Sequence, residues 1–393
     1  MIMKWKLEPK VLRGIRESTK EKGEIYMKRF QVKQIGDISA NITANTNACL
    51  LFVDINLYDF DLLNQLNDKY PDVDIVAITT SGEIGEKGIT SKTISGIVFD
   101  QAFKTSAVLV EDAHLAPIIS RHKLSDSARV AGINLNKKNP HDIALVFPTG
   151  LNGCEERFVS TINALYNYDD PLVVGATAGD DIQFNATYVY VNGEHDSNGG
   201  AVLFIHTTHD IKVYKETIFN PTDKVLRVTK ADHDNRCVYT LNGKPAAAAY
   251  AEQLGVSEHE LENYFMSNPL GRQAGDDIFV ASPFQINPDK SINFYCQVFE
   301  GARLVMLEPK DAVKEINLTV DTINKDFRSI EGGLLFNCIL RKLQFANDHT
   351  TGIIGNAMNR IPNACGLISY GEQLGRTQIN QTLLIVIFGK VVY

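Results

Sequence analysis

The chain has 393 residues, a net charge of −8, 44% hydrophobic residues and 22% charged residues. These values are typical of a globular protein, and the length favours two domains over one core. The negative charge argues against a nucleic-acid partner, because phosphate contacts need clustered Lys and Arg. No apolar run approaches the roughly 20 residues that span a bilayer, so the sequence predicts a cytoplasmic protein with no membrane span.

Basic residues gather in the first thirty positions, and we expect residues 1–30 to form a basic arm on the surface. The segment has too few apolar residues for a signal peptide. The cysteines are scattered and form no CxxC pair, which favours free thiols in a reducing compartment over zinc ligands or disulfides. They are Cys49, Cys154, Cys237, Cys296, Cys338 and Cys365.

The clearest pattern is an internal repeat of residues 48–85 and 143–181. Each copy reads as a buried strand, an amphipathic helix, a second apolar strand and a loop of small residues. Continuous apolar strands are typical of sheets that are covered on both faces. The sequence therefore predicts an α/β fold of the mixed α+β kind, with duplicated strand–helix–strand units and mixed sheets in the N-terminal domain. The strands are expected at Leu50–Val53, Ile75–Ile78, Ala144–Phe147 and Leu172–Val174.

Antiparallel strands follow each copy. Residues 92–99 and 187–205 alternate as half-buried strands would, and Asn192-Gly193 is a strong hairpin signal. A boundary is expected near residue 219, which divides the chain into a domain at 31–218 and a second α/β domain at 219–393.

Further elements are expected in this second domain. A helix should begin at Pro245 and end at Gly255, and another should cover 311–327. The apolar run Thr382–Phe388 predicts a central strand.

A set of motifs in this order resembles the FIST family over nearly the whole chain from about residue 45. They are FPTGLNGCEERF, GATAGDD, VYTLNGKPAAAAYAEQLG, NPLG, EGARLVMLEPKD, GLLFNCILRKL and GLISYGEQLGRTQINQT. The resemblance implies FIST N-terminal and C-terminal regions and a sensory module for signal transduction that binds a small ligand, with amino acids as one ligand class. For some stand-alone members it implies haem, nitric oxide sensing and a histidine kinase partner. It implies no established enzymatic activity.

The sequence departs from the family pattern at two places. Members often carry Gly-Cys just before the first small-residue loop, where this chain has Ala77-Ile78. Members also often have a histidine before Asn-Gln-Thr, where this chain has Ile379. Both departures raise the expectation of a different ligand.

Cys154 is a candidate nucleophile, because the pattern Asn152-Gly153-Cys154-Glu155 predicts a helix start that would place the thiol in the first turn. Glu155 and Glu156 oppose a low thiol pKa and would repel a phosphate. No histidine is evident as a base, and the first repeat has no matching cysteine. A cysteine-dependent hydrolase is therefore the third-ranked reading, behind a binding module without catalysis, and Cys154 is otherwise a packed residue at a helix start.

The two small-residue loops are the stronger candidates for binding a ligand. Ligands in open α/β sheets lie beyond the carboxyl ends of strands, and small residues let them approach the backbone. The alternative is that the glycines only permit tight turns. The residues are Thr80, Ser81, Gly82 and Glu83 in the first loop, and Thr177, Gly179, Asp180 and Asp181 in the second.

The C-terminal half offers Arg341, Glu372, Asn380 and Thr382. An Arg and a Glu together suit an amino-acid zwitterion. The alternative is an internal salt bridge between Arg341 and Glu372. In the ligand-binding reading, we expect the ligand in a cleft between the halves.

Haem is the runner-up ligand, which the family resemblance implies. A non-covalent haem needs an axial ligand, and His195 and His206 are the candidates. The chain has no CxxCH motif, which excludes covalent attachment.

Overall fold

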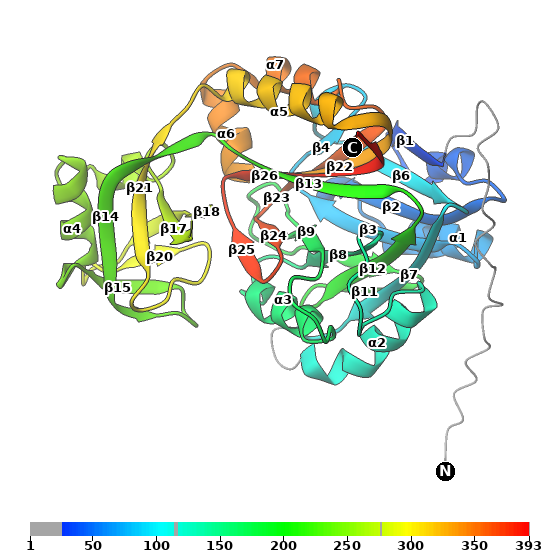
Figure 1. The fold of residues 1–393 in the computed structure, drawn as a ribbon, viewed down its shortest axis with the longest axis horizontal. Coiled ribbons are helices and arrows are strands. Elements are labelled where there is room, and N and C mark those ends of the chain that lie inside the picture. Colours follow the sequence, from blue (N-terminus) through cyan, green and yellow to red (C-terminus); the bar gives the residue numbers. More distant parts are fainter. Residues whose placement is uncertain (1–25, 114–116, 276, 393) are drawn as a thin grey trace, which may run out of the picture.

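The computed structural model describes residues 26–113, 117–275 and 277–392. The chain forms a large body and a smaller lobe that stands beside it, on the left of Figure 1. Of the predicted basic arm, residues 1–25 lie outside the described residues, and the remainder begins strand β1 (Met27–Val32). None of the helices in the described parts of the chain is both long and apolar enough to cross a bilayer.

Three six-stranded sheets make up the body, and all three have the same strand order. The first contains β1, β6 (Ile94–Asp100), β2 (Thr46–Asp54), β3 (Asp74–Thr80), β10 (Val189–Val191) and β11 (Glu194–Asp196). The second contains β7 (Phe103–Val110), β12 (Gly200–Thr207), β8 (Asp142–Pro148), β9 (Val173–Ala176), β24 (Glu372–Leu374) and β25 (Thr377–Ile379). The third contains β13 (Asp210–Thr217), β26 (Thr382–Val391), β22 (Phe327–Cys338), β23 (Ala364–Ser369), β4 (Glu83–Gly85) and β5 (Gly88–Thr90).

Each sheet is built on one parallel pair of strands, β2 with β3, β8 with β9 and β22 with β23. The other strand pairs are antiparallel. The pairs are joined by α1 (Phe60–Lys69), by α3 (Glu155–Asn163), and by α6 (Ile339–Asn347) with α7 (Thr351–Met358). The predicted strand–helix–strand repeat is therefore confirmed, and the fold contains a third copy of it near the C-terminus.

The hairpin that follows each parallel pair joins a different sheet. The β4–β5 hairpin of the first repeat pairs with β23, β10 of the second repeat pairs with β3, and β24 of the third repeat pairs with β9. The exchange runs in a cycle through all three repeats. The body is thus a pseudo-threefold assembly in which every sheet is completed by another repeat.

Three equivalent phenylalanines pack together where the repeats meet. Phe52, Phe147 and Phe336 come from β2, β8 and β22 and are fully buried. Their ring centroids lie 5.7–6.4 Å apart in edge-to-face contacts. They belong to the largest apolar core of the body, which takes side chains from all three sheets.

The lobe is inserted into the third repeat, between β13 and β22. Its sheet is formed by β14 (Phe219–Asp232), β15 (Cys237–Leu241), β16 (Lys244–Pro245), β17 (Leu270–Ala274), β18 (Asp277–Ala281), β19 (Pro283–Ile286), β20 (Ile292–Phe294) and β21 (Arg303–Pro309). Helix α4 (Ala246–Leu254) packs on this sheet with a core of its own. Helix α5 (Ala312–Asp326) leads back to the body across the top of Figure 1.

The boundary expected near residue 219 is the point where the chain enters the lobe. The segment predicted as one C-terminal domain contributes to both parts, because β22 to β26 return to the body and pair there with strands of the N-terminal segment. Long-range strand pairing of this kind leaves no mark in local composition.

Several local predictions are confirmed. Asn192 and Gly193 form the turn between β10 and β11, both with positive φ. Gly255 caps α4 in the left-handed conformation, α5 covers the predicted segment, and β26 is central in its sheet. The expectation of half-buried strands is wrong for β6 and β12, whose residues are nearly all buried. One face of β6 belongs to the core shared by the three sheets, and the other belongs to an apolar cluster that includes Leu63 and Leu66 of α1.

Candidate functional site

The three loops that follow β3, β9 and β23 meet at one end of the body. They share the pattern Thr/Ser-x-Gly-Glu/Asp at residues 80–83, 177–180 and 369–372. Each loop is hydrogen-bonded through its backbone to the other two. Ser81 N donates to Ile368 O at 2.9 Å, Gly179 N to Thr79 O at 2.9 Å and Thr177 N to Gly371 O at 2.8 Å. Sequence analysis found two of these loops, and the motif Ser-Tyr-Gly-Glu at 369–372 was the available signal for the third.

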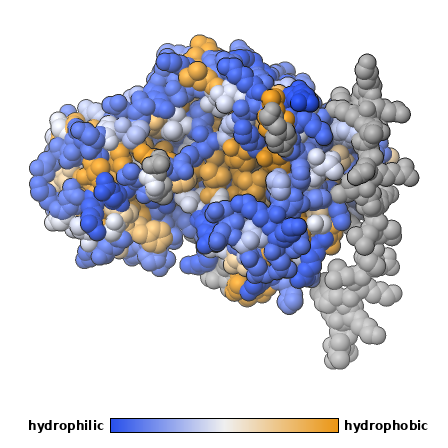
Figure 2. Space-filling model, in the orientation of Figure 1, coloured by the Kyte–Doolittle hydropathy of each residue, from blue (hydrophilic) through white to orange (hydrophobic). Residues whose placement is uncertain are grey.

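A cavity of about 270 Å³ lies beside this junction, between the body and the lobe. This volume is close to the lower end of the range for small-ligand pockets, roughly 300 Å³. Figure 2 shows apolar surface on both the body and the lobe on the face drawn. The cavity is lined by Leu151, Gly153, Glu155, Ile182, Phe184, Arg236, Tyr295, Ile339, Leu340, Leu343 and Tyr370.

The cavity lies beyond the carboxyl ends of the strands, where α/β folds bind ligands. Leu151, Gly153 and Glu155 follow β8, and Ile339, Leu340 and Leu343 belong to α6, which follows β22. Arg236 and Tyr295 come from the lobe. Segments far apart in the sequence thus converge on one mostly apolar space.

An ion-pair cluster joins the lobe to the body at the cavity wall. Arg236 Nη2 lies 2.6 Å from Glu155 Oε2 and 2.6 Å from Glu156 Oε2. Arg236 Nη1 also donates to Tyr295 O at 2.9 Å, and Gln297 N donates to Glu156 Oε1 at 2.7 Å. The two carboxylates raise the pKa of Arg236 despite its burial. The guanidinium therefore stays charged and holds the two parts of the molecule together.

Three apolar residues at the cavity have unusual backbone conformations. Leu151, Ile182 and Phe184 have φ values of 73°, 64° and 53°. Positive φ is costly for such side chains, above all for a β-branched isoleucine. They are also 47%, 40% and 63% exposed. Strained, exposed apolar side chains around a cavity are typical of a binding site.

The predicted loop residues lie behind the cavity wall and do not line it. Thr80, Ser81, Gly82, Glu83, Thr177, Gly179 and Asp180 are buried. A Cβ on Gly179 would lie 2.3 Å from Ser81 Oγ, so glycine is needed for the close contact of the two loops.

Two acids of the second loop position the neighbouring wall. Asp180 accepts a hydrogen bond from Tyr370 Oη and others from the backbone of residues 185 and 186. Tyr370 Oη in turn accepts from Ile182 N at 2.8 Å. The exposed Asp181 binds Lys342 Nζ at 2.9 Å. Asp180 thus orients the side chain of Tyr370, which lines the cavity and in turn holds the backbone of Ile182.

Arg341 forms its ion pair with Glu216 and not with Glu372. Its Nη2 lies 2.5 Å from Glu216 Oε1, and its Nε donates to Asn337 Oδ1 at 2.9 Å. Both charged side chains are buried away from the cavity. Sequence analysis missed Glu216 because it lies 125 residues away in β13.

Glu372 instead accepts a hydrogen bond from Ser369 Oγ at 2.7 Å. Burial raises its pKa well above the ordinary value. Asn380 is buried in the link between β25 and β26, and Thr382 is buried at the start of β26; neither lines the cavity. The four residues therefore do not form a zwitterion site open to the cavity.

Cys154 has the properties of a packed residue. It is itself the N-cap of α3, and Asn152 accepts a hydrogen bond from Cys154 N at 3.2 Å, which differs from the predicted cap at Asn152. The side chain is 1% exposed, and burial followed by the nearby Glu155 raises the pKa of the thiol. A protonated, buried thiol gives the hydrolase hypothesis no support.

The haem candidates have other partners. His195 stacks on Phe60 with ring centroids 4.0 Å apart, and His206 Nδ1 lies 2.6 Å from Asp142 Oδ1. Of the described residues that line either of the two cavities, none is His, Cys or Met. In the described parts of the chain, no three His, Cys, Asp or Glu residues are grouped to hold a metal ion. The cavity does contain Tyr295 and Tyr370, but burial raises the pKa of both phenols, which disfavours the phenolate that an axial tyrosine ligand supplies. Neither His195 nor His206 lines the cavity.

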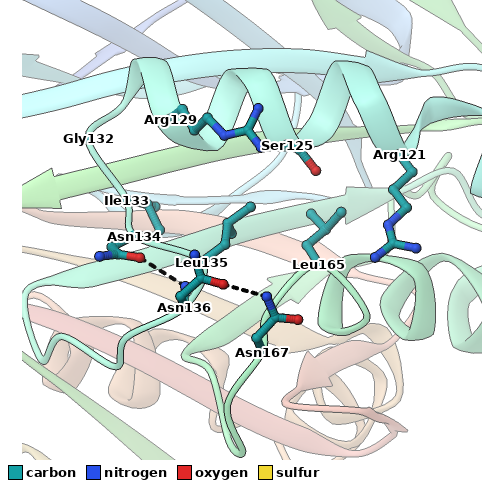
Figure 3. A pocket seen from close by; sticks show the side chains of 10 residues that line it. All are labelled: Arg121, Ser125, Arg129, Gly132, Ile133, Asn134, Leu135, Asn136, Leu165 and Asn167. Carbon is teal, nitrogen blue, oxygen red and sulfur yellow. Dashed lines mark hydrogen bonds between the residues drawn. The ribbon is translucent and has the colours of Figure 1, made fainter.

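A second cavity, of about 420 Å³, lies under α2 (Arg121–Val130). Figure 3 shows Arg121, Ser125 and Arg129 on this helix above the loop that carries Asn134 and Asn136. Its polar groups largely engage one another or nearby residues: Arg129 pairs with Asp126 at 2.8 Å, and Asn167 Nδ2 donates to Asn136 Oδ1 at 2.5 Å. All its segments belong to the second repeat, so we favour the cavity beside the lobe as the ligand site.

Glu83 should make the stability of the protein depend on pH. Burial raises its pKa to about 7 from an ordinary 4.5, although hydrogen bonds from Thr80 and Thr93 oppose the shift. The folded state then binds more protons than the unfolded state between these values, so the free energy of unfolding falls as pH rises from 4.5 to 7. Glu83→Gln should gain up to about 3 kcal/mol relative to the wild type over this range. Urea unfolding at a series of pH values measures this change.

The exposed Glu86 provides the control for this prediction. Glu86→Gln should track the wild type at every pH. A constant difference in stability between Glu83→Gln and the wild type from pH 4.5 to 8 would contradict the raised pKa.

Family comparison agrees with this architecture. The FIST N domain model matches residues 47–244, and the FIST C domain model matches residues 246–374. The chain therefore belongs to the FIST family, whose domains are associated with signal-transduction sensors that bind small ligands. A search of curated proteins found no match to the chain.

Proposed function

We propose that this protein is a sensor that binds a small ligand in the cavity between the body and the lobe and signals to a separate protein. The observation that carries the proposal is the cavity itself, which both parts of the molecule line. A histidine kinase is the partner class that the family resemblance favours. Amino acids are the first ligand class to test.

The contacts between lobe and body support a conformational signal. Besides the Arg236 cluster, Arg272 Nη2 donates to Gln378 O, Gln381 Nε2 donates to Met266 O at 2.8 Å and Lys215 pairs with Asp277 at 2.9 Å. These polar contacts lie beside an apolar core in which Val280, Val305 and Leu307 of the lobe are clustered with residues of the body. A ligand that binds both parts would favour one arrangement of the lobe, because it shifts an equilibrium by its differential affinity.

Calorimetric melting with a panel of the twenty amino acids and small apolar amines tests the proposal. A ligand should raise the melting temperature by mass action. The variant Leu340→Trp should abolish the rise, because the larger side chain fills the cavity.

The matched control is Leu318→Trp, at a 51% exposed position on α5, which should respond as the wild type does. A rise that survives in Leu340→Trp would place the ligand elsewhere and contradict the proposed site.

A further inference from the structure

We propose that the cavity takes an organic cation, a small molecule with an apolar or aromatic body and one ammonium group. The inference rests on the proposed function, because it assumes that the cavity is the ligand site. It adds the chemical class of the ligand.

The apolar body follows from the lining. Leu151, Ile182, Ile339, Leu340 and Leu343 supply aliphatic wall, and three aromatic side chains complete it. Pockets lined in this way bind ligands through buried apolar area, and their few polar groups fix the orientation. A ligand that is polar all round would leave its own groups unsatisfied here.

The carboxylate of Glu155 is the polar group in the lining that can accept a further hydrogen bond. Its side chain lines the cavity and the residue is only 4% exposed. Oε2 binds Arg236, and Oε1 accepts no hydrogen bond from the residues that the structure describes. An ammonium group placed at Oε1 would make a charge-assisted hydrogen bond in a site largely shielded from water.

The charged residues at the cavity wall also favour a positively charged ligand. Two carboxylates, Glu155 and Glu156, share the single guanidinium of Arg236, which leaves one excess negative charge. The first turn of α3 offsets part of it, about half a charge. Among the described residues that line the cavity, Arg236 is the one cation, and it already binds both carboxylates and Tyr295 O. A ligand carboxylate would thus lack a free partner.

Aromatic rings add a second attraction for a cation. Phe184 and Tyr370 stack with centroids 6.1 Å apart, and Tyr295 lies on the lobe side. The faces of aromatic rings attract ammonium groups when these lie within about 6 Å. Tyr370 is held in place through its hydroxyl by Asp180 and Ile182, so its ring is positioned before any ligand binds.

Titration calorimetry with four matched probes tests the charge preference. The probes are 2-phenylethylamine (cation), 2-phenylethanol (neutral), 3-phenylpropionate (anion) and phenylalanine (zwitterion). The wild-type protein should bind the amine roughly tenfold or more tightly than the other three, as expected for a charge-assisted hydrogen bond.

Two variants locate the effect. Glu155→Gln should reduce the affinity for the amine to that for the alcohol, and unchanged binding of the alcohol shows that the cavity is intact. Glu156→Gln also removes one carboxylate that binds Arg236, but Glu156 does not line the cavity. This variant should therefore keep most of the preference for the amine.

The outcomes separate this inference from the proposed function. The inference alone is overturned if the wild-type protein binds the alcohol or the anion more tightly than the amine. It is also overturned if Glu155→Gln still prefers the amine to the alcohol. Binding of another compound from the melting panel that Leu340→Trp blocks has the same consequence, if none of the four probes binds. No binding of any compound in either experiment overturns both.

Discussion

Replacing Arg341 by methionine is expected to lower the free energy of unfolding by about 3–5 kcal/mol. The substitution leaves the carboxylate of Glu216 buried without its partner, and both side chains are at most 2% exposed. An uncompensated charge in such a place costs far more than the pair itself contributes. Urea unfolding measures the loss as a lower midpoint with an unchanged slope.

A second substitution separates this effect from simple loss of packing. The double variant Arg341→Met/Glu216→Leu should recover much of the stability, because no buried charge remains. The neighbouring Lys342→Met is the matched control. It removes a partly exposed ion pair with Asp181 and a hydrogen bond to Ser81 O, and should cost at most about 2 kcal/mol. An Arg341→Met protein that is as stable as the wild type but no longer binds ligand would contradict our account and support the role in binding that the sequence predicts.

Phe336→Ala is expected to cost about 3–5 kcal/mol, because it leaves a cavity at the centre of the body. The ring is fully buried and meets Phe52 and Phe147 at 6.4 and 5.7 Å between centroids. Since the three rings occupy equivalent positions, Phe52→Ala and Phe147→Ala should cost similar amounts. Thermal and urea unfolding of the three variants measure the losses.

The combinations of these variants test the pseudo-threefold centre. Any two of the substitutions should be non-additive, because the residues are in contact and share the cavity. Phe299→Ala, at a 49% exposed position in the lobe, should change stability by only about 0.5 kcal/mol. Additive losses, or a large loss at only one of the three positions, would contradict a shared centre.

The insertion of the lobe explains why a threefold body has the cavity that we propose as the ligand site at one place. The first repeat has a short connection at residues 33–45 between its first two strands in the chain, whereas the third repeat has the whole lobe at 218–309 in the corresponding place. The lobe covers the carboxyl ends of β8 and β22 through Arg236 and Tyr295. The asymmetry of the insertion therefore selects one of three related positions.

Much of the local structure was determined by the sequence alone. Apolar runs predicted the buried parallel strands, Asn192-Gly193 predicted the hairpin and Gly255 predicted the end of α4, because these signals act within a few residues. The ordered motifs also predicted the FIST family. The small-residue loops were located correctly in the chain, and the site residues proposed in them remain untested by any ligand.

The tertiary structure alone decided which of these pieces meet. Hairpin β4–β5 could have extended its own sheet, yet it pairs with β23, some 280 residues further on, because packing of three repeats buries more apolar surface than one repeat can. Likewise, the sequence does not identify which acidic residue pairs with Arg341, because only folding brings Glu216 beside it. Six separate segments of the chain line the cavity. Long-range packing decides where these segments meet, and hydrophobic periodicity and turn motifs carry no information about such packing.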